Sequence, residues 1–400
     1  MRMRGRIFGW GMSVLLVLFI FGGFAPAARA QRYYVYIGTY TEHGSEGIYV
    51  CDFDAATGKL GAPMLAAKSV QPSFLAVSPD RKFMYAVNEA DTFNGQPGGG
   101  VSAYAIDFTT GRLNLLNAVS SRGGGPAFIA LDKTGHFALV ANYDGGSVAV
   151  FRLGADGKIG ESTGFAQHAG SSVNHERQEA PHAHAVAMSP DNRFAIVADL
   201  GLDQLLVYPF DATNGTLGSA RVVKTAPSAG PRHLVFSASG NFLYVVNELA
   251  STVTAYSWDA ARGEMTPVQT ISTGPAGPQN TAGEVLFDPA GKFLYVSNRG
   301  GENSIAVFRV DVGKGTLRRI ESVPTNGQTP RNFAFDPLGR WLLVGNQDSK
   351  TVYTFKVAKH SGRLKQAGPP VAIDSPAMVD FVTLPTTFGP IIDEGLHKKN

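Results

Sequence analysis

The sequence predicts an all-β chain that folds as a seven-bladed β-propeller, with four antiparallel strands in each blade. One observation is a strand-closing Asn or Asp that returns about every 50 residues, at Asn88, Asn142, Asp199, Asn247, Asn298 and Asn346. A second is a series of turn glycines with similar spacing, namely Gly58, Gly111, Gly157, Gly215, Gly263, Gly315 and Gly362. A third is that 47 glycines and 23 prolines separate short apolar runs, without a segment of helical period.

The repeating unit is clearest in residues 230–248. His233–Phe236 is read as a strand with side chains alternately outward and inward, Ser239–Asn241 supplies a turn, and Phe242–Val246 is aromatic and β-branched, so this stretch predicts two strands. Each turn of the Thr57-Gly58 type joins two further strands. Four-stranded antiparallel sheets repeated radially are the blades of a propeller.

The two ends of the chain are predicted to share one blade. The first repeat begins at Tyr33 and has no innermost strand before it, whereas Met378–Leu384 is an apolar run left over at the other end. We expect this run to supply the missing strand and so to close the ring. The propeller should therefore span residues 31–385, followed by a polar tail over 386–400.

Residues 1–30 are predicted to be a signal peptide. Three arginines lie within the first six residues, Val14–Phe21 is apolar, and Ala28-Arg29-Ala30 has the small-x-small pattern of a cleavage site before Gln31. The apolar run is short of the roughly 20 residues that span a bilayer, which argues against a membrane anchor. We therefore expect an exported protein, periplasmic or secreted, without a membrane partner after cleavage.

Charge and cysteine content exclude several classes of function. Once the four arginines of the predicted signal peptide are removed, basic and acidic residues nearly balance, so nothing favours a nucleic-acid partner. The single cysteine, Cys51, cannot form an internal disulfide. The expected partner is a small molecule.

Two columns of residues are predicted to meet at one mouth of the propeller axis. In each blade the innermost strand starts there and the second strand ends there. The position that opens the innermost strand, which we call the opening column, holds Ser73, Ala127, His184, Arg232, Gly283 and Arg331. The position that follows the strand-closing Asn or Asp, which we call the closing column, holds Glu89, Tyr143, Leu200, Glu248, Arg299 and Gln347.

Ionisable residues in these columns predict a functional site. A purely structural position would repeat one residue type, whereas these positions vary and include three arginines, two glutamates and a histidine, with His182, His233 and Glu284 close by in sequence. Charges at a solvated mouth cost little and could be without function. The opposite face is built from repeated Pro-Asp and Thr-Gly turns, however, which favours the functional interpretation. Gly283 is expected to widen the pocket.

Six motifs at these positions resemble the seven-bladed propeller lactonase family, which includes propeller-type 6-phosphogluconolactonases and the carboxy-cis,cis-muconate cyclase. The resemblance covers roughly residues 33–385. It is carried by Pro181-His182-Ala183-His184, Asp199-Leu200-Gly201-Leu202-Asp203, Gly230-Pro231-Arg232-His233, Val246-Asn247-Glu248, Ser297-Asn298-Arg299-Gly300 and Thr329-Pro330-Arg331-Asn332-Phe333. The resemblance implies catalytic roles for one or both histidines of the first motif, with His184 preferred because it lies in the opening column, and for Arg232, Glu248 and Arg299.

Lactone chemistry suits these residue types. Opening a lactone needs a base for water, a stabiliser for the tetrahedral oxyanion and a proton donor for the leaving oxygen. Glu248 or His184 could be the base, Arg232 and Arg299 could hold an oxyanion or an anionic substituent, and the remaining histidine could donate a proton. The substrate-binding residues are then predicted to be Arg331, His233, Glu89 and Glu284.

No cofactor or metal is expected. His182 and His184 are too few ligands for a closed zinc shell, and the neighbouring arginines repel a cation. The sequence also lacks the Gly-x-Ser-x-Gly motif of a serine hydrolase. Replacing Glu248 with Gln is expected to abolish turnover with almost no change in melting temperature.

The predicted function is an exported lactonase, similar to 6-phosphogluconolactonase, that hydrolyses a sugar-type lactone by general acid/base catalysis. Because the protein is expected to be exported, the sequence does not decide whether the substrate carries a phosphate group. One alternative is a non-catalytic propeller that serves as a binding platform, because repeats such as Leu139–Tyr143 also resemble the YVTN-type propellers of exported surface proteins. A second alternative is a muconate-type cyclase, since closing a lactone uses the same acid and base in the opposite direction.

Overall fold

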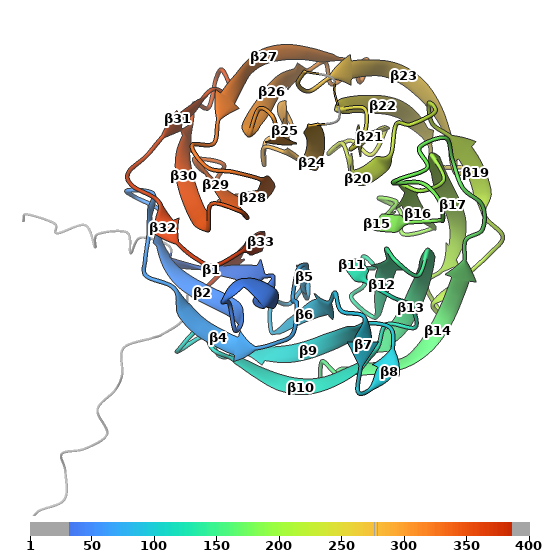
Figure 1. Ribbon diagram of the computed structural model, residues 1–400, viewed down its shortest axis with the longest axis horizontal. Helices are drawn as coiled ribbons and strands as arrows, with labels where there is room; N and C mark the ends of the chain where they lie inside the picture. The colour runs from blue at the N-terminus through green and yellow to red at the C-terminus, as the bar shows by residue number, and fades with distance from the viewer. Residues whose placement is uncertain (1–31, 276, 278, 386–400) are drawn as a thin grey trace, which may run out of the picture. The chain divides into compact units, whose positions relative to one another are not determined.

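The structure is a computed structural model that describes residues 32–275, 277 and 279–385. These residues form seven antiparallel sheets arranged in a ring (Figure 1), so the predicted all-β, seven-bladed propeller is confirmed. The described part of the chain contains one short 3-10 helix, η1 (Thr41–His43), and no helix long and apolar enough to cross a bilayer. The predicted signal peptide, 1–30, and the predicted tail, 386–400, lie outside the described residues.

The two inner strands of each blade position the site. The innermost strands of blades 1 to 7 are β33 (Pro376–Thr383), β5 (Leu75–Val77), β11 (Pro126–Leu131), β15 (Ala183–Met188), β20 (Pro231–Phe236), β24 (Asn280–Phe287) and β28 (Pro330–Phe335). They pair in the same order with the second strands β1 (Arg32–Thr39), β6 (Phe83–Asn88), β12 (Phe137–Asn142), β16 (Phe194–Asp199), β21 (Phe242–Asn247), β25 (Phe293–Gly300) and β29 (Trp341–Asn346).

The outer strands complete the sheets. The third strands are β2 (Gly47–Asp54), β9 (Gly100–Ile106), β13 (Ser147–Leu153), β17 (Gln204–Asp211), β22 (Thr252–Asp259), β26 (Ser304–Val310) and β30 (Thr351–Val357). The outermost strand is continuous in four blades, as β10 (Leu113–Ser120), β14 (Ile159–Gln167), β23 (Glu264–Ser272) and β27 (Leu317–Pro324). It is split in the others, as β3 (Lys59–Leu60) with β4 (Met64–Lys68), β18 (Thr216–Leu217) with β19 (Arg221–Lys224), and β31 (Leu364–Gln366) with β32 (Val371–Ala372). A small hairpin, β7 (Thr92–Phe93) and β8 (Gln96–Pro97), extends from blade 2.

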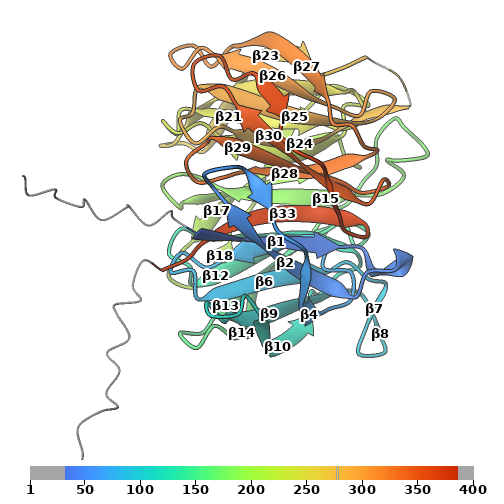
Figure 2. The ribbon, with the colours of Figure 1, turned by 90° about the vertical axis from the view of Figure 1, so that its left-hand side faces the viewer.

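The ring closes through its first and last strands. Strand β33 pairs antiparallel with β1, from Tyr33 opposite Thr383 to Thr39 opposite Pro376. The two strands lie side by side in both ribbon views (Figures 1 and 2). The expectation that the C-terminal strand completes the first blade is therefore confirmed. Closure gives blade 1 the innermost strand that the first sequence repeat lacks.

The hydrophobic core consists of seven clusters, one between each pair of neighbouring blades. The cluster between blades 1 and 7, for example, joins Phe53 to Trp341, and another joins Tyr208 of blade 4 to Phe137 of blade 3. Each sheet therefore buries both faces against its neighbours. This explains why the second strand of each blade, such as β12 and β21, is apolar on both sides until its closing residue.

The turn glycines pack against the neighbouring blade. Gly215 has φ +72°, and a Cβ placed on it would lie 2.2 Å from the Phe137 ring of the previous blade. Gly58 is similar, with φ +77° and the Trp341 ring 2.5 Å from its Cβ position. A left-handed backbone and a close aromatic contact both require glycine, which accounts for its periodic return in the sequence.

Candidate active site

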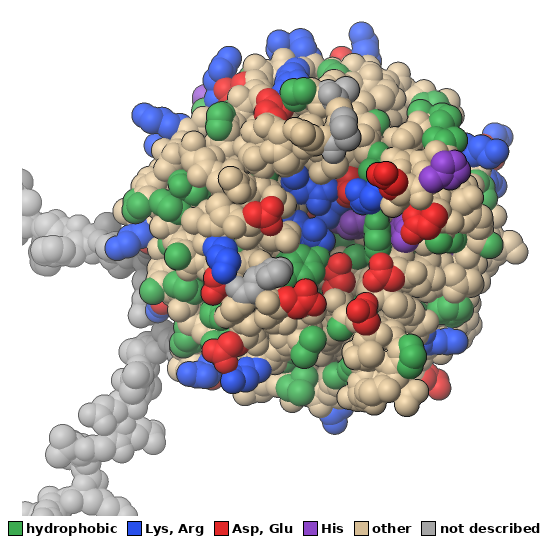
Figure 3. Space-filling model, in the orientation of Figure 1, with side chains coloured by type: hydrophobic (Ala, Val, Ile, Leu, Met, Phe, Trp, Pro, Cys, Tyr) green, Lys and Arg blue, Asp and Glu red, His purple; other side chains and the backbone are tan. Residues whose placement is uncertain are grey.

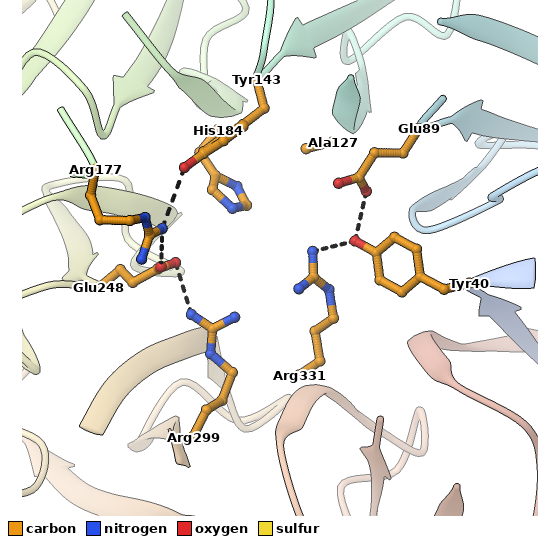
Figure 4. Close-up of a pocket in the computed structure, with 9 residues that line it drawn as sticks. All are labelled: Tyr40, Glu89, Ala127, Tyr143, Arg177, His184, Glu248, Arg299 and Arg331. Carbon is orange, nitrogen blue, oxygen red and sulfur yellow. Dashed lines mark hydrogen bonds and ion pairs between the residues drawn. The ribbon is translucent and has the colours of Figure 1, made fainter. Parts of the chain in front are cut away.

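A cavity of about 270 Å³ lies at one mouth of the propeller axis. In the space-filling view it is a hollow near the centre of the face, with basic and histidine side chains deep inside and acidic groups around it (Figure 3). The residues that line it are Tyr40, Glu89, Ala127, Tyr143, Arg177, His184, Glu248, Arg299 and Arg331 (Figure 4). Three arginines against two glutamates favour an anionic ligand or an oxyanion.

Bulges at the opening column aim its side chains toward the axis. In blade 4 the pairing of β15 with β16 skips His184, and in blade 7 the pairing of β28 with β29 skips Arg331. Blade 3 skips Ala127 in the same way. The extra residue of a bulge leaves the ladder, and its side chain can turn away from the sheet faces. In these three blades the innermost strand therefore presents its opening residue to the cavity.

Glu248 is the centre of an ion-pair cluster. Its Oε2 accepts a hydrogen bond from Arg232 Nε at 2.9 Å and forms an ion pair with Arg299 Nη2 at 2.8 Å. Its Oε1 accepts a hydrogen bond from Arg177 Nη2 at 2.8 Å. Glu248 is 4% exposed and Arg232 is 2% exposed. Arg232 also donates from Nη1 to the Gly283 carbonyl at 3.0 Å. Blades 5 and 6 and the loop between blades 3 and 4 thereby meet at one carboxylate.

The protonation of this cluster follows from burial and charge. Burial raises the pKa of Glu248, but the guanidinium groups of Arg299, Arg232 and Arg177 outweigh burial and hold the pKa well below its usual value. Burial lowers the pKa of Arg232 to about 9, with Arg299 adding to the effect, so Arg232 is charged at neutral pH. Both oxygens of this carboxylate are engaged by guanidinium groups, so neither is free to take a proton from water. Its contacts suit it instead to holding the arginines in place.

Arg331 lies across the cavity and is held by an aromatic side chain. Its Nη2 donates to the Tyr40 hydroxyl, and its guanidinium carbon lies 4.9 Å from the centre of the Tyr40 ring. Tyr40 in turn donates to Glu89 Oε2 at 2.8 Å, and Ser73 donates to the same oxygen. Among the described residues, Arg331 is in no ion pair with a carboxylate. Its remaining N–H groups are available to a ligand.

The two histidines of the Pro181–His184 motif have different environments. His184 lines the cavity, its Nδ1 is buried without a hydrogen-bond partner in the described structure, and its ring meets Tyr143 edge to face. Burial lowers the pKa of His184 well below its usual value, and Arg232 adds to this, so the imidazole is neutral. His182 instead stacks on the Tyr143 ring with centres 4.5 Å apart and bonds to the Tyr143 carbonyl at 3.1 Å. His182 is not among the residues that line the cavity.

A second layer lies beneath the cavity, and we call it the floor. It is formed by the residues that follow the opening column, namely Phe74, Phe128, His233, Glu284 and Asn332. His233 Nδ1 lies 3.0 Å from Glu284 Oε1, and Asn332 donates to Glu284 Oε2. The Asn332 Oδ1 accepts from the Val379 amide at 3.0 Å. Hydrogen bonds of the floor therefore run from blade 5 through blades 6 and 7 to blade 1.

The structure distributes the predicted site residues over both layers. Predicted residues that line the cavity are His184, Glu248, Arg299, Arg331 and Glu89. Arg232, His233 and Glu284 lie below it, and His182 lies beside it. The predicted widening by Gly283 is wrong, because Ser297 Oγ and Arg299 Cδ would lie 2.7 Å and 3.4 Å from its Cβ. That glycine allows close packing and leaves its carbonyl to Arg232.

The lining residues that were not among the predicted site residues are Tyr40, Ala127, Tyr143 and Arg177. Tyr40 follows Thr39, which occupies the strand-closing position of blade 1, but the Asn/Asp signal is absent there. Tyr143 was in the closing column but has no ionisable group near neutral pH. Arg177 comes from the loop between β14 and β15, which lies outside the repeat. Ala127 and Tyr143 already stood in the two columns, and extending the closing column to blade 1 would have identified Tyr40. No periodic signal pointed to Arg177.

Metal binding has no support in the described residues. They contain no group of three or more His, Cys, Asp and Glu side chains placed to hold a metal ion.

We expect stability to fall as the pH drops from about 6.5 toward 4. Burial lowers the pKa of His233 to about 4, against the opposing effect of Glu284, and the pKa of His184 is also lowered. In this window the unfolded chain, with histidine pKa values near 6.5, binds protons that the folded protein does not bind. Each of the two histidines therefore lowers the free energy of unfolding by about 1.4 kcal/mol for every pH unit of the drop. Denaturant midpoints between pH 7.5 and 5 measure the slope. His233→Gln should reduce it, and an unchanged slope would contradict this assignment.

Comparison with protein families identifies one match over nearly the whole propeller. The family model of a lactonase with a 7-bladed β-propeller matches residues 34–381. The chain is 37% identical over 355 residues to a 6-phosphogluconolactonase of Bacillus subtilis, which covers 88% of this chain and 99% of that protein. It is 32% identical over 354 residues to a 6-phosphogluconolactonase of Formosa agariphila, with coverage of 87% and 99%.

A solved structure has the same fold with substantial sequence identity. The structure of a periplasmic gluconolactonase from Pseudomonas aeruginosa superposes with a TM-score of 0.83 and 36% identity. It covers 88% of this chain, and all of that chain is covered.

Proposed function

The chain belongs to the seven-bladed β-propeller lactonase family and is a lactone-hydrolysing enzyme, and we propose that its substrate is a sugar-type lactone bound in the cavity of about 270 Å³. The observation that carries this proposal is the convergence of Arg299, Arg331 and neutral His184 on one cavity (Figure 4). The two arginines could bind the carbonyl oxygen as negative charge develops on it. The neutral histidine could accept a proton at neutral pH.

We assign distinct roles to the charged groups. Arg331 and Arg299 hold the carbonyl oxygen, because both line the cavity and Arg331 has no carboxylate partner in the described structure. Glu248 orients Arg299 and Arg232 instead of acting as the base. Glu89, with one oxygen held by Tyr40 and Ser73, accepts hydrogen bonds from substrate hydroxyl groups. No step needs a cofactor.

We also propose that the enzyme is exported and that its substrate is an unphosphorylated aldonolactone. The support is the signal-peptide pattern of residues 1–30 and the likeness to a periplasmic gluconolactonase. Phosphorylated sugars are scarce outside the cytoplasm, so an exported lactonase has little use for a phosphate site. Amino-terminal sequencing of the protein recovered from the periplasm tests the cleavage, which should leave Gln31 as the first residue.

The assay that tests this function compares δ-gluconolactone with its 6-phosphate. We expect hydrolysis of δ-gluconolactone well above the spontaneous rate, with kcat/KM at least equal to that for the 6-phosphate. The variant Arg331→Lys keeps the positive charge but loses the forked hydrogen-bond geometry, and it should hydrolyse δ-gluconolactone more slowly than the wild-type enzyme. Rates equal to the buffer blank for both lactones would overturn the assignment. A tenfold preference for the 6-phosphate would overturn the unphosphorylated substrate alone.

A further inference from the structure

A buried histidine–carboxylate pair lies directly beneath the proposed substrate cavity. We propose that His233, oriented by Glu284, is the general base of the reaction and that the water it activates occupies a small second cavity beneath the first. This inference rests on the proposed lactonase function and adds to it the source of the nucleophile. His233 then becomes a catalytic residue and Glu284 a positioning residue, instead of the substrate-binding residues that the sequence suggested.

The hydrogen bonds around Glu284 determine which nitrogen of His233 carries the proton. Glu284 Oε1 accepts from the Val285 amide at 2.9 Å and lies 3.0 Å from His233 Nδ1, while Oε2 accepts from Asn332. Burial raises the pKa of Glu284, but His233 and the other donors outweigh it and keep the group ionised. An ionised carboxylate only accepts, so Nδ1 must donate and the lone pair resides on Nε2.

His233, which carries the free nitrogen, lines a space where one water molecule fits. His233 is 4% exposed, and its Nε2 is buried without a partner in the described structure. His233 lines a cavity of about 10 Å³, which has room for about one water. The polar groups around this cavity are Ser73, Arg232, Arg331 and Asn332. A buried water requires two to four such partners, so the cavity meets the condition for holding one.

The small cavity adjoins the substrate cavity. Ala127 and Arg331 line both, so a water in the lower space lies beneath a lactone in the upper one. Ala127 matters here because a larger side chain at that opening position would separate the two spaces. The arrangement allows attack on the carbonyl carbon from below while Arg331 contacts the carbonyl oxygen from the side.

A structural role alone does not explain these residues. Blades 2 and 3 fill the same floor position with Phe74 and Phe128, whose rings stand edge to face against His233 at 5.7 Å and 5.1 Å. A fully apolar floor would therefore be possible. Burying an imidazole and a carboxylate costs solvation free energy that packing does not require. The charged groups that face His233 are Glu284, Arg232 and Arg331, with neutral His184 at 5.1 Å between ring centres.

The proposed reaction balances in two steps. The water oxygen forms a bond to the lactone carbonyl carbon, and its proton passes to His233 Nε2, while the oxyanion is held by Arg299 and Arg331. The ring C–O bond then breaks, and the ring oxygen takes the proton from His233 as it leaves. One water is consumed, and the product is an open hydroxy acid that loses its carboxyl proton to solvent. Glu284 stabilises the imidazolium that exists between the two steps.

The test compares His233→Gln and Glu284→Gln with Tyr244→Phe. Tyr244 donates to the Gly315 carbonyl at 2.9 Å, so its hydroxyl links the same two blades from a buried position outside both cavities. We expect kcat for δ-gluconolactone to fall at least about a hundredfold in the first two variants, with δ-gluconolactam binding within threefold of wild type. The residual rate of His233→Gln should rise in proportion to hydroxide. Tyr244→Phe should keep wild-type kcat.

Three results would overturn the inference. One is a kcat within threefold of wild type in His233→Gln. Another is a loss of lactam binding that matches the loss of kcat, because it would show that the pair supports the shape of the pocket only. The third is a residual rate of His233→Gln that depends on pH in the same way as the rate of the wild-type enzyme. Each presupposes turnover by the wild-type enzyme, so failure of the lactonase function itself is distinguishable as the absence of any catalysed hydrolysis.

Discussion

Replacing Glu248 with Gln should abolish turnover and destabilise the fold by about 3–5 kcal/mol, the typical cost of removing one partner from a buried ion pair. The carboxylate is the shared partner of Arg232, Arg299 and Arg177, and Arg232 is 2% exposed. An amide leaves those charges buried without compensation, and Arg299 is then no longer held toward the cavity. Urea denaturation and δ-gluconolactone hydrolysis measure the two effects. From the sequence we expected this substitution to abolish turnover with almost no change in melting temperature, because the sequence gave no sign that Glu248 is buried.

A matched variant separates the two effects. Arg177 belongs to the same cluster, but its side chain is 40% exposed, and Glu248 keeps two other partners without it. Arg177→Gln should therefore cost less than about 1 kcal/mol, as expected for a half-exposed ion pair. If Glu248→Gln were as stable as Arg177→Gln, the buried cluster could not be an important source of stability.

Replacing Arg331 with Lys should lower kcat by about 10²–10³-fold, as expected for the loss of an oxyanion donor. Lysine keeps the charge but cannot donate to the Tyr40 hydroxyl and the substrate oxygen from one planar group. The folded state should be affected little, because Arg331 is only partly buried and has no ion pair in the described structure. Steady-state kinetics on δ-gluconolactone provide the measurement.

The control for this variant is Tyr40→Phe, which keeps the ring beneath the guanidinium but removes the hydroxyl that orients it. A loss of about tenfold is expected, smaller than that of Arg331→Lys. If Arg331→Lys raised KM and left kcat unchanged, Arg331 would bind a ground-state substituent and would not stabilise the oxyanion.

The fold was predictable because its rules are local and repeated. The strand-closing Asn247 and the turn glycine Gly215 recur in the sequence since every blade needs the same strand end and the same left-handed turn against an aromatic neighbour. Repetition also made exceptions visible. His184, Glu248 and Arg299 stood out because their columns vary, and all three line the cavity.

Contacts across the axis were not predictable in this way. Arg177 belongs to an irregular loop, and nothing in its sequence context indicates that it reaches Glu248 from 71 residues away. The same holds for His233, whose neighbours Phe74, Phe128, His184 and Glu284 come from four other blades. These contacts depend on how seven bulged strands converge.

The amino-acid sequence by itself determined the all-β propeller, the closure of its ring and the mouth at which ionisable residues collect, because strand period, turn chemistry and repeat length are properties of neighbouring residues. Tertiary structure alone decided which charges are buried, which are paired and which are free. The difference is physical: burial and pairing depend on the distances between blades, and those distances convert Glu248 from a candidate base into the anchor of three arginines. They also place the free Nε2 of His233 beneath the cavity where a lactone would bind.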